Sequence, residues 1–190
     1  MRLLENISAI ILAGGKSSRL GRDKCDVIFE GQTFLNRQIR KVENLGISDI
    51  YISGYQGNVC DKKIIEDNYH LGPMSGIYTC IDKIKNEKAL VLSVDVPLVP
   101  ENELARLIEF AETRDELITV LSHNDKIEPL IAVYDRRVMP TVTKIIQEAG
   151  NYSMKNLMNT VGYARYESEE NDKYFININY EKDLQELISI

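Results

Sequence analysis

Short apolar runs alternate with amphipathic segments along the chain. Residues 7–13 form a continuous apolar run, typical of a strand that is covered on both faces of a sheet. Similar patterns predict further strands at residues 50–52, 63–66, 89–94, 116–122, 130–134 and 175–179. Most of these strands are followed by a segment with helical spacing.

The apolar positions between residues 35 and 45 share one face of a predicted helix, which Thr33 caps and Gly46 ends. Further helices are predicted at residues 74–84, 101–111, 137–149, 153–160 and 181–188, and a charged surface loop at 167–173. This alternation predicts an α/β fold, a mostly parallel Rossmann-like sheet with helices on both faces. A chain of 190 residues fits one domain, residues 1–190.

Composition narrows the classes of partner. The net charge of −6 argues against nucleic-acid binding, which needs a basic face. No apolar run is long enough to span a bilayer, and the charged N-terminus is unlike a signal peptide, so we expect a cytoplasmic protein without a membrane partner. The cysteines Cys25, Cys60 and Cys80 are predicted to be reduced thiols. His70 and His123 are predicted to be surface or loop histidines without a metal.

The loop after the first strand is the most informative segment. Leu12 and Ala13 lead into Gly14 and Gly15, and small residues there let a bulky ligand approach the backbone. The cations that follow are Lys16, Arg19, Arg22 and Lys24. The spacing fits neither the P-loop nor the dinucleotide-binding pattern. A triphosphate is the ligand that this loop favours, and an ordinary glycine turn with solvated charges is the alternative.

Ligands of such sheets bind beyond the carboxyl ends of the strands, where this chain places Ser53, Asp67 and Asp95. Asp95 directly follows an apolar strand, where a carboxylate needs a partner such as Mg²⁺; a helix-capping or turn aspartate is the alternative. Asp67 can accept a hydrogen bond from a sugar hydroxyl or a base amine, or it belongs to a surface turn.

Two further segments are compatible with this chemistry. Asn177 and Asn179 lie on one face of a predicted strand. Their amides could supply a second metal ligand or a ribose contact, and a polar strand edge is the alternative. Residues 128–132 are placed where they could form the rim of an acceptor pocket, and the ordinary start of a strand explains them equally well. No Ser-His-Asp set is visible. The pattern therefore favours phosphoryl or nucleotidyl transfer, in which positioning and charge neutralisation carry the reaction.

These residues resemble the molybdenum cofactor guanylyltransferases, nucleotidyltransferases with the nucleoside-diphosphate-sugar transferase fold. The resemblance covers nearly the whole chain. The segments that carry it are residues 12–24, 65–67, 72–76, 93–97, 129–134 and 175–179. It implies transfer of GMP from GTP to molybdopterin, the organic part of the molybdenum cofactor, with release of pyrophosphate. Mg²⁺ is the implied cofactor, and molybdoenzyme-maturation proteins are implied partners.

The resemblance also implies roles for single residues. Leu12, Ala13 and Gly14 would contact the nucleotide through the backbone, Asp67 would contact the nucleoside, and Asp95 would hold Mg²⁺. Lys16, Arg19 and Lys24 would stabilise charge in the transition state, with Gly15 in the same loop. The family often has asparagine where this chain has Ser53, so a base or ribose contact is in doubt.

Other functions stay open at this stage. A cytidylyltransferase acting on molybdopterin or another phosphorylated acceptor is the first alternative. A sugar-phosphate nucleotidyltransferase is the next, although those chains are usually longer. A nucleotide-binding protein without catalysis is a third, against which the presence of both Lys24 and Asp95 argues. All readings that involve catalysis require Lys24 and Asp95 to share one cleft.

Overall fold

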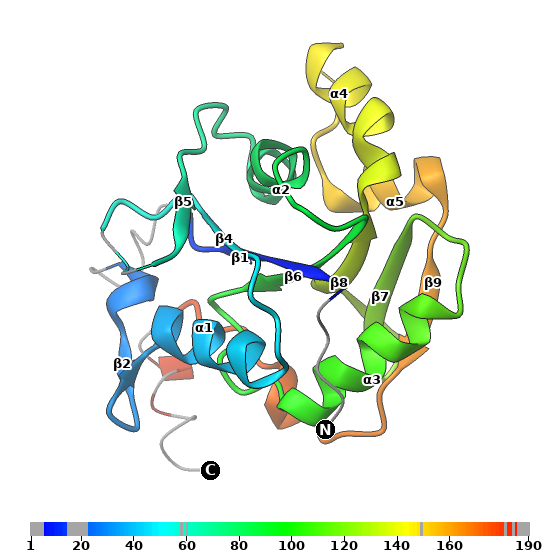
Figure 1. Cartoon of the computed structure of the whole chain (residues 1–190). Coiled ribbons are helices and arrows are strands. Elements are labelled where there is room, and N and C mark those ends of the chain that lie inside the picture. Colours follow the sequence, from blue (N-terminus) through cyan, green and yellow to red (C-terminus); the bar gives the residue numbers. More distant parts are fainter. Residues whose placement is uncertain are drawn as a thin grey trace.

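The computed structural model describes residues 6–14, 23–57, 59, 61–148, 150–180, 182, 183 and 185. At its centre is a seven-stranded sheet with the order β5-β4-β1-β6-β8-β7-β9 (Figure 1). The strands of the structure are β1 (Ser8–Leu12), β2 (Ile28–Phe29), β3 (Gln32–Thr33), β4 (Ile50–Ser53), β5 (Lys63–Ile65), β6 (Lys88–Ser93), β7 (Ile118–His123), β8 (Lys126–Asp135) and β9 (Ala164–Glu167). β2 and β3 form a separate two-stranded hairpin.

The helices cover both faces of the sheet. They are α1 (Phe34–Asn44), α2 (Pro73–Ile81), α3 (Glu101–Glu112), α4 (Met139–Gln147) and α5 (Met154–Val161), with short 3₁₀ turns η1 (Lys24–Asp26), η2 (Arg136–Val138) and η3 (Asp172–Phe175). In Figure 1, α1 and α3 lie below the sheet, and α2, α4 and α5 lie above it. Within the ranges given above, every helix is too short or too polar to cross a bilayer.

Alternating side chains of the central strands fill two separate cores. In β1, Ala9 and Ile11 pack with α1 and α3, whereas Ile10 and Leu12 pack with α2 and α4. Successive strand residues point to opposite faces, so a continuous apolar run supplies both cores at once. The sheet is parallel except for β8, which pairs antiparallel with β6 and β7. The predicted α/β fold with a mostly parallel sheet is confirmed.

Helix α1 follows its prediction closely. The hydroxyl of Thr33 accepts a hydrogen bond from the Asn36 amide at 3.2 Å, as an N-cap does. Gly46, at φ +86°, ends the helix. Helix α2 is shorter than predicted, because it ends at Ile81 with Asp82 as its C-cap. The predicted helix at 137–149 divides into η2 and α4, with Pro140 in the first turn of α4.

The C-terminal region differs most from its prediction. Residues 175–179 are not a strand: η3 ends at Phe175 and the chain then runs irregularly. The Ile178 amide donates to the Asp95 carbonyl at 2.8 Å, so this backbone is bonded to a loop rather than to a neighbouring strand. The last strand is instead β9, which no pattern predicted and which pairs parallel with β7. The helix predicted at 181–188 lies mostly outside the described residues.

Two cysteines are buried free thiols, Cys25 and Cys80, as predicted, and Cys60 lies outside the described residues. His70 is exposed in a loop, also as predicted. The prediction of a surface or loop position is wrong for His123, which ends β7 and is buried. Its ring stacks on Phe175, and its nitrogens lie 2.9 Å from Asp172 Oδ1 and 3.1 Å from Glu128 Oε1.

Candidate active site

The four parallel strands β5, β4, β1 and β6 end side by side. In the register of the sheet, Leu12 pairs with both Ser53 and Ser93, and Ser53 pairs with Ile65. The ladder continues one residue beyond the strands, since the Ala13 amide donates to the Ser53 carbonyl at 2.9 Å. Of the residues predicted to meet at this edge, Gly14, Ser53, Asp67 and Asp95 lie in the described part of the chain, and each stands at or just beyond the end of one of these strands.

Two glycines face each other across this edge. A Cβ atom on Gly54 would lie 2.7 Å from the Cα of Gly14, and Gly54 has a φ of +77°. Only residues without a side chain fit so close an approach at this backbone conformation. The backbone of the two loops is thereby left open to a ligand, and Gly14 is exposed.

Lys24 and Asp95 lie side by side, as the proposed chemistry requires. The turn η1 is capped by Asp23, whose Oδ1 accepts from the Cys25 amide at 2.9 Å, and Cys25 Sγ donates to the Ala13 carbonyl at 3.2 Å. These bonds hold η1 on the end of β1. Lys24 Nζ then lies 3.5 Å from Asp95 Oδ2 and donates to Asn179 Oδ1 at 2.6 Å.

The Asp95 carboxylate is only half paired. Its Oδ2 faces Lys24, whereas its Oδ1 is buried and accepts no hydrogen bond from any described residue. A buried carboxylate oxygen without a partner costs free energy, and native structures seldom leave one so without a reason. In the described structure, Asp95 Oδ1 is therefore left with unused capacity for a cationic or hydrogen-bonding group.

The Asp67 carboxylate is engaged in its own loop. Its Oδ1 accepts from the amides of Tyr69 and His70 at 3.2 and 3.3 Å, and its Oδ2 accepts from the Ser75 hydroxyl at 2.7 Å. Asp67 thus shapes the loop that leads into α2, at the edge where the sequence placed a nucleoside. It remains partly exposed there.

Leu12 and Ser53 contribute backbone to the edge. Both side chains are buried against α2, where a Cβ atom on Gly76 would lie 2.9 Å from Leu12 Cδ2 and 3.1 Å from Ser53 Oγ. A glycine in this first turn of α2 allows the helix to approach the strand ends. Gly15, Lys16 and Arg19 lie outside the described residues, so their predicted roles stay predictions.

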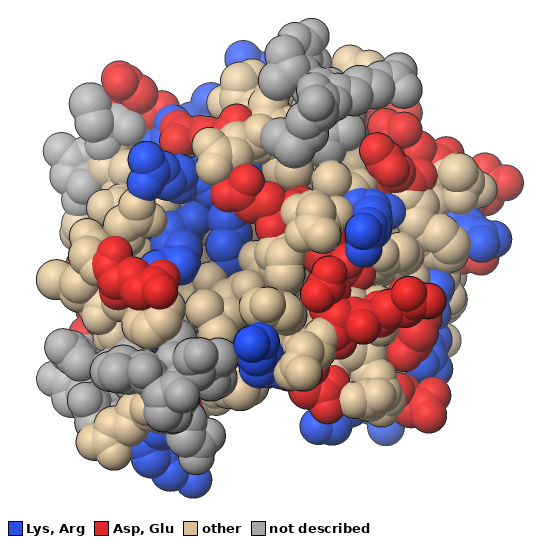
Figure 2. All heavy atoms as spheres, turned by 90° about the horizontal axis from the view of Figure 1, so that it is seen from below, with Lys and Arg blue, Asp and Glu red and all other residues tan. Residues whose placement is uncertain are grey.

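The face of the molecule that is seen from below in Figure 2 is mixed in charge. Figure 2 shows basic side chains gathered in a hollow on the face seen from below, with acidic side chains around it and over much of the remaining surface. This local concentration contrasts with the net charge of −6 of the whole chain. A polyanion is attracted to such a basic hollow even in an acidic protein.

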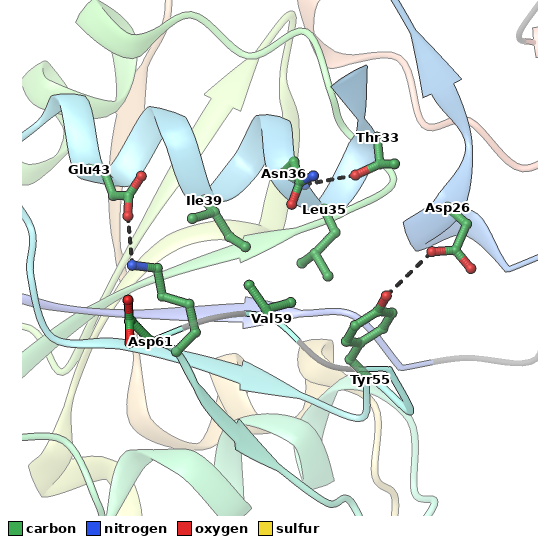
Figure 3. Close-up of a pocket in the computed structure, with 10 residues that line it drawn as sticks. Asp26, Thr33, Leu35, Asn36, Ile39, Glu43, Tyr55, Val59 and Asp61 are labelled. Atoms are coloured by element: carbon green, nitrogen blue, oxygen red, sulfur yellow. Dashed lines mark hydrogen bonds and ion pairs between the residues drawn. The ribbon is translucent and has the colours of Figure 1, made fainter. Parts of the chain in front are cut away.

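A separate pocket of about 510 Å³ opens between α1 and the segment after β4 (Figure 3). Its floor is apolar, with Leu35, Ile39 and Val59, and its rim carries acidic side chains such as Asp26 and Asp61. None of the candidate residues Lys24, Ser53, Asp67 and Asp95 lines it. Its lining carries three acidic side chains, Asp26, Glu43 and Asp61, against one basic side chain, Lys62, so its charge disfavours a triphosphate.

Comparison with known proteins decides the family. Residues 9–164 match the family described as MobA-like NTP transferase domain. The chain belongs to this family. A probable molybdenum cofactor guanylyltransferase of Flavobacterium johnsoniae is 31% identical to this NTP transferase over 187 residues, which cover 97% of each chain. It is an enzyme, a nucleotidyltransferase, as its sequence predicted.

Solved structures share the NTP transferase fold. The molybdopterin-guanine dinucleotide biosynthesis protein A of Archaeoglobus fulgidus superposes with a TM-score of 0.77 at 20% identity, over 96% of this chain and 99% of that one. The Rv0371c protein of Mycobacterium tuberculosis, in complex with manganese, gives a TM-score of 0.74 at 13% identity, over 98% and 99% of the two chains. At these identities the likeness shows the fold alone.

The donor set of this NTP transferase fits Mg²⁺. In the described ranges no group of three or more His, Cys, Asp or Glu side chains forms a metal cluster. Mg²⁺ commonly takes one or two protein oxygens and completes its shell with phosphates and water. Asp95, with its unpartnered Oδ1, and Asn179 offer such oxygens. Asn177 is exposed, and no described contact links it to Lys24 or Asp95.

Sequence reasoning missed two buried polar residues on α1. Gln38 is fully buried and Lys41 is 7% exposed, and both contact the loop that carries Asp95. Burial lowers the pKa of Lys41 to about 7; Arg37 acts in the same direction and Glu101 opposes it. The signal was present in the sequence, since both are polar side chains next to the apolar stripe of a predicted amphipathic helix.

Proposed function

We propose that this nucleotidyltransferase transfers GMP from GTP to molybdopterin and releases pyrophosphate. The observation that carries the proposal is the half-paired Asp95 carboxylate beside Lys24 and Asn179, at the edge where the Gly14 and Gly54 backbones meet. The guanylyltransferase names of relatives that match nearly the whole chain support the choice of nucleotide and acceptor.

The reaction needs no protein nucleophile. A phosphate oxygen of molybdopterin forms a bond to the α-phosphorus of GTP, and the bond from that phosphorus to the bridging oxygen of the β-phosphate breaks. The electron pair of the broken bond leaves with pyrophosphate. The acceptor phosphate is already ionised at neutral pH, so proton removal is not the main task of the site. The protein contributes positioning and charge stabilisation.

Each described residue has a task in this scheme. The backbones of Leu12, Ala13 and Gly14 hold the nucleotide, and Ser53 and Asp67 border the nucleoside. Lys24 stabilises negative charge on the transferring phosphoryl group. Asp95 and Asn179 would hold Mg²⁺, which when bound neutralises phosphate charge as a Lewis acid. Lys16 and Arg19 add positive charge from the same loop in this proposal.

The ion pair between Lys24 and Asp95 has a role before the substrate arrives. At 3.5 Å, with both side chains about one-fifth exposed, it is a weak pair. Lys24 is also held there by its hydrogen bond of 2.6 Å to Asn179 Oδ1. A triphosphate competes effectively for this ammonium group because it carries several negative charges.

The decisive experiment is a pyrophosphate-release assay with molybdopterin and Mg²⁺, run in parallel with GTP, CTP and ATP. We expect release with GTP that depends on molybdopterin. Release of pyrophosphate with CTP but not with GTP would contradict guanylyl transfer and indicate a cytidylyltransferase. Nucleotide binding without pyrophosphate release, with all three nucleotides, would contradict the proposed catalysis and indicate a binding protein.

A further inference from the structure

Helix α1 holds the turn that carries Asp95. Gln38 is fully buried on the face of α1 that packs against this turn. Its Nε2 donates to the Ser93 carbonyl at 2.7 Å and to the Val96 carbonyl at 3.0 Å. One side-chain amide therefore bridges the backbone on both sides of Asp95 and fixes the curvature of the turn between them.

The same face of α1 makes two more contacts with this loop. One turn further along the helix, Lys41 Nζ donates to the Pro97 carbonyl at 2.6 Å. Beyond it, Asn44 Nδ2 donates to Glu101 Oε1 at 2.9 Å, at an exposed position. The contacts of α1 therefore continue from Gln38, which lies nearest Asp95, to Asn44, which contacts Glu101 at the start of α3.

Buried polar side chains at a helix interface are costly, and apolar residues of similar size would pack there without that cost. Gln38 even leaves its own Oε1 buried without a partner in the described structure. The gain must therefore be geometric, because two directed hydrogen bonds specify one backbone shape, whereas apolar packing tolerates several.

The backbone around Asp95 is held from the other sides as well. The Val94 amide donates to the Leu12 carbonyl at 3.2 Å, and the Asp95 carbonyl accepts from the Ile178 amide at 2.8 Å. Asp95 thus combines a fixed main chain with a carboxylate that has an unpartnered oxygen. This combination is typical of a ligand that is oriented in advance for a group that arrives later.

We propose that Gln38 is a positioning residue, which sets the direction of the Asp95 carboxylate toward a divalent cation bound with the triphosphate. The inference depends on the proposed function, because it assigns Asp95 to the metal. Gln38 itself touches neither the nucleotide nor the metal. Its effect is transmitted through the carbonyls of Ser93 and Val96.

The test compares Gln38→Met, which removes the donor and keeps the length of the side chain, with Asn44→Ala as a control on the same helix and loop. Two quantities are measured: the Mg²⁺ concentration that gives half-maximal pyrophosphate release at saturating GTP, and Mn²⁺ binding in the presence of a non-hydrolysable GTP analogue, by electron paramagnetic resonance. We expect Gln38→Met to weaken both by about 10–100-fold, with rate recovered at high metal concentration. We expect Asn44→Ala to leave both unchanged.

A double mutant separates positioning from general packing. If Gln38 acts through Asp95, Gln38→Met adds no further loss of Mn²⁺ binding to a protein that already carries Asp95→Asn. Equal losses in both backgrounds, or a folded Gln38→Met variant with wild-type metal dependence, would overturn the inference. If Gln38→Met does not fold, Gln38→Asn, which is too short to bridge both carbonyls, is measured in the same way.

A different result would contradict the proposed function. Wild-type protein would then release no pyrophosphate from GTP, CTP or ATP. Mn²⁺ binding with the GTP analogue still tests the inference in that case, because it does not require turnover.

Discussion

Asp49 and Asp95 lie at opposite ends of the central sheet, and each has a carboxylate oxygen buried in the protein. Asp49 directly precedes β4, and its side chain accepts hydrogen bonds from Ser8 Oγ at 2.7 Å, Lys63 Nζ at 2.7 Å and the Lys85 amide at 2.9 Å. Asp95 follows β6 and has one ion pair of 3.5 Å and one oxygen without a partner.

The difference separates a carboxylate that the protein itself satisfies from one for which we propose a function. At the amino end of the sheet, the protein itself satisfies the charge, so Asp49 ties β1, β4, β5 and the loop before β6 together. At the carboxyl end, the described residues leave the charge incompletely satisfied, and we propose that a ligand completes it. The count of hydrogen-bond partners is what carries this contrast between the two aspartates.

The sharpest test makes the same substitution, aspartate to asparagine, at each end of the sheet and compares the effects. We expect Asp95→Asn to lower kcat by about 10²–10³-fold, the range found for groups that stabilise transition-state charge, with little change in stability. Lys24→Met is expected to behave alike, with Lys144→Met on the exposed surface of α4 as its control. Steady-state pyrophosphate release and urea denaturation measure the two effects. A kcat within twofold of wild type for Asp95→Asn would contradict its assigned role.

The matching change at the other end is expected to act on stability. Asp49→Asn places an amide among three donors and removes the partner of Lys63, so the free energy of unfolding should fall by about 2–3 kcal/mol. The kcat of the folded protein should stay near the wild-type value. Urea denaturation and the same activity assay check both. A loss of kcat at unchanged stability would break the contrast between the two aspartates.

The stability that Asp49 contributes is expected to depend on acid pH. Burial raises the pKa of Asp49, but hydrogen bonds from Lys63, the Lys85 amide and Ser8, together with the charge of Lys63, outweigh it and hold the pKa below the ordinary value. Its contribution is therefore full above the pKa of an unfolded aspartate, about 3.9, and is lost as pH falls through the lower folded pKa.

The comparison that reveals this dependence is the difference in stability between wild type and Asp49→Asn. We expect this difference to be constant from pH 7 to about 5 and to shrink below about 4, since the variant cannot titrate at this position. Urea denaturation at a series of pH values measures it. A difference that stays constant to pH 3 would show that the carboxylate charge is not what stabilises this end.

The smallest expected effect concerns the backbone of the active-site edge. In Gly54→Ala, the new methyl group would lie 2.7 Å from Gly14 Cα, and the alanine would have to adopt a φ of +77°. We expect a loss of stability of about 1–2 kcal/mol and weaker nucleotide binding. Gly162→Ala is the control, because it also has a positive φ of +76° but meets no atom within 4 Å. Equal nucleotide affinity in the two variants would contradict a role for the close approach of Gly14 and Gly54.

Much of this architecture could be predicted from local patterns. The apolar run of β1 and the amphipathic spacing of α1 are local features, and both elements form where predicted. β9 and the irregular course of residues 176–179 could not be predicted in this way. The short segment at 164–167 pairs with the edge of the sheet that β7 offers, and the amide of Ile178 bonds to the Asp95 carbonyl rather than to a neighbouring strand. Such non-local hydrogen bonds leave no periodic signal in the sequence.

For the candidate site, the sequence by itself determined which residue types stand just beyond the strand ends: glycines, Asp67 and Asp95. The strands of a parallel sheet bring their carboxyl ends to one edge, so these residues were bound to lie at that edge once the sheet formed. Only the tertiary structure decided that Asp67 is bonded within its loop, that Asp95 keeps an unpartnered oxygen and that Gln38 holds its turn. Those properties depend on distances between side chains far apart in the chain, and the local pattern of residues does not encode them.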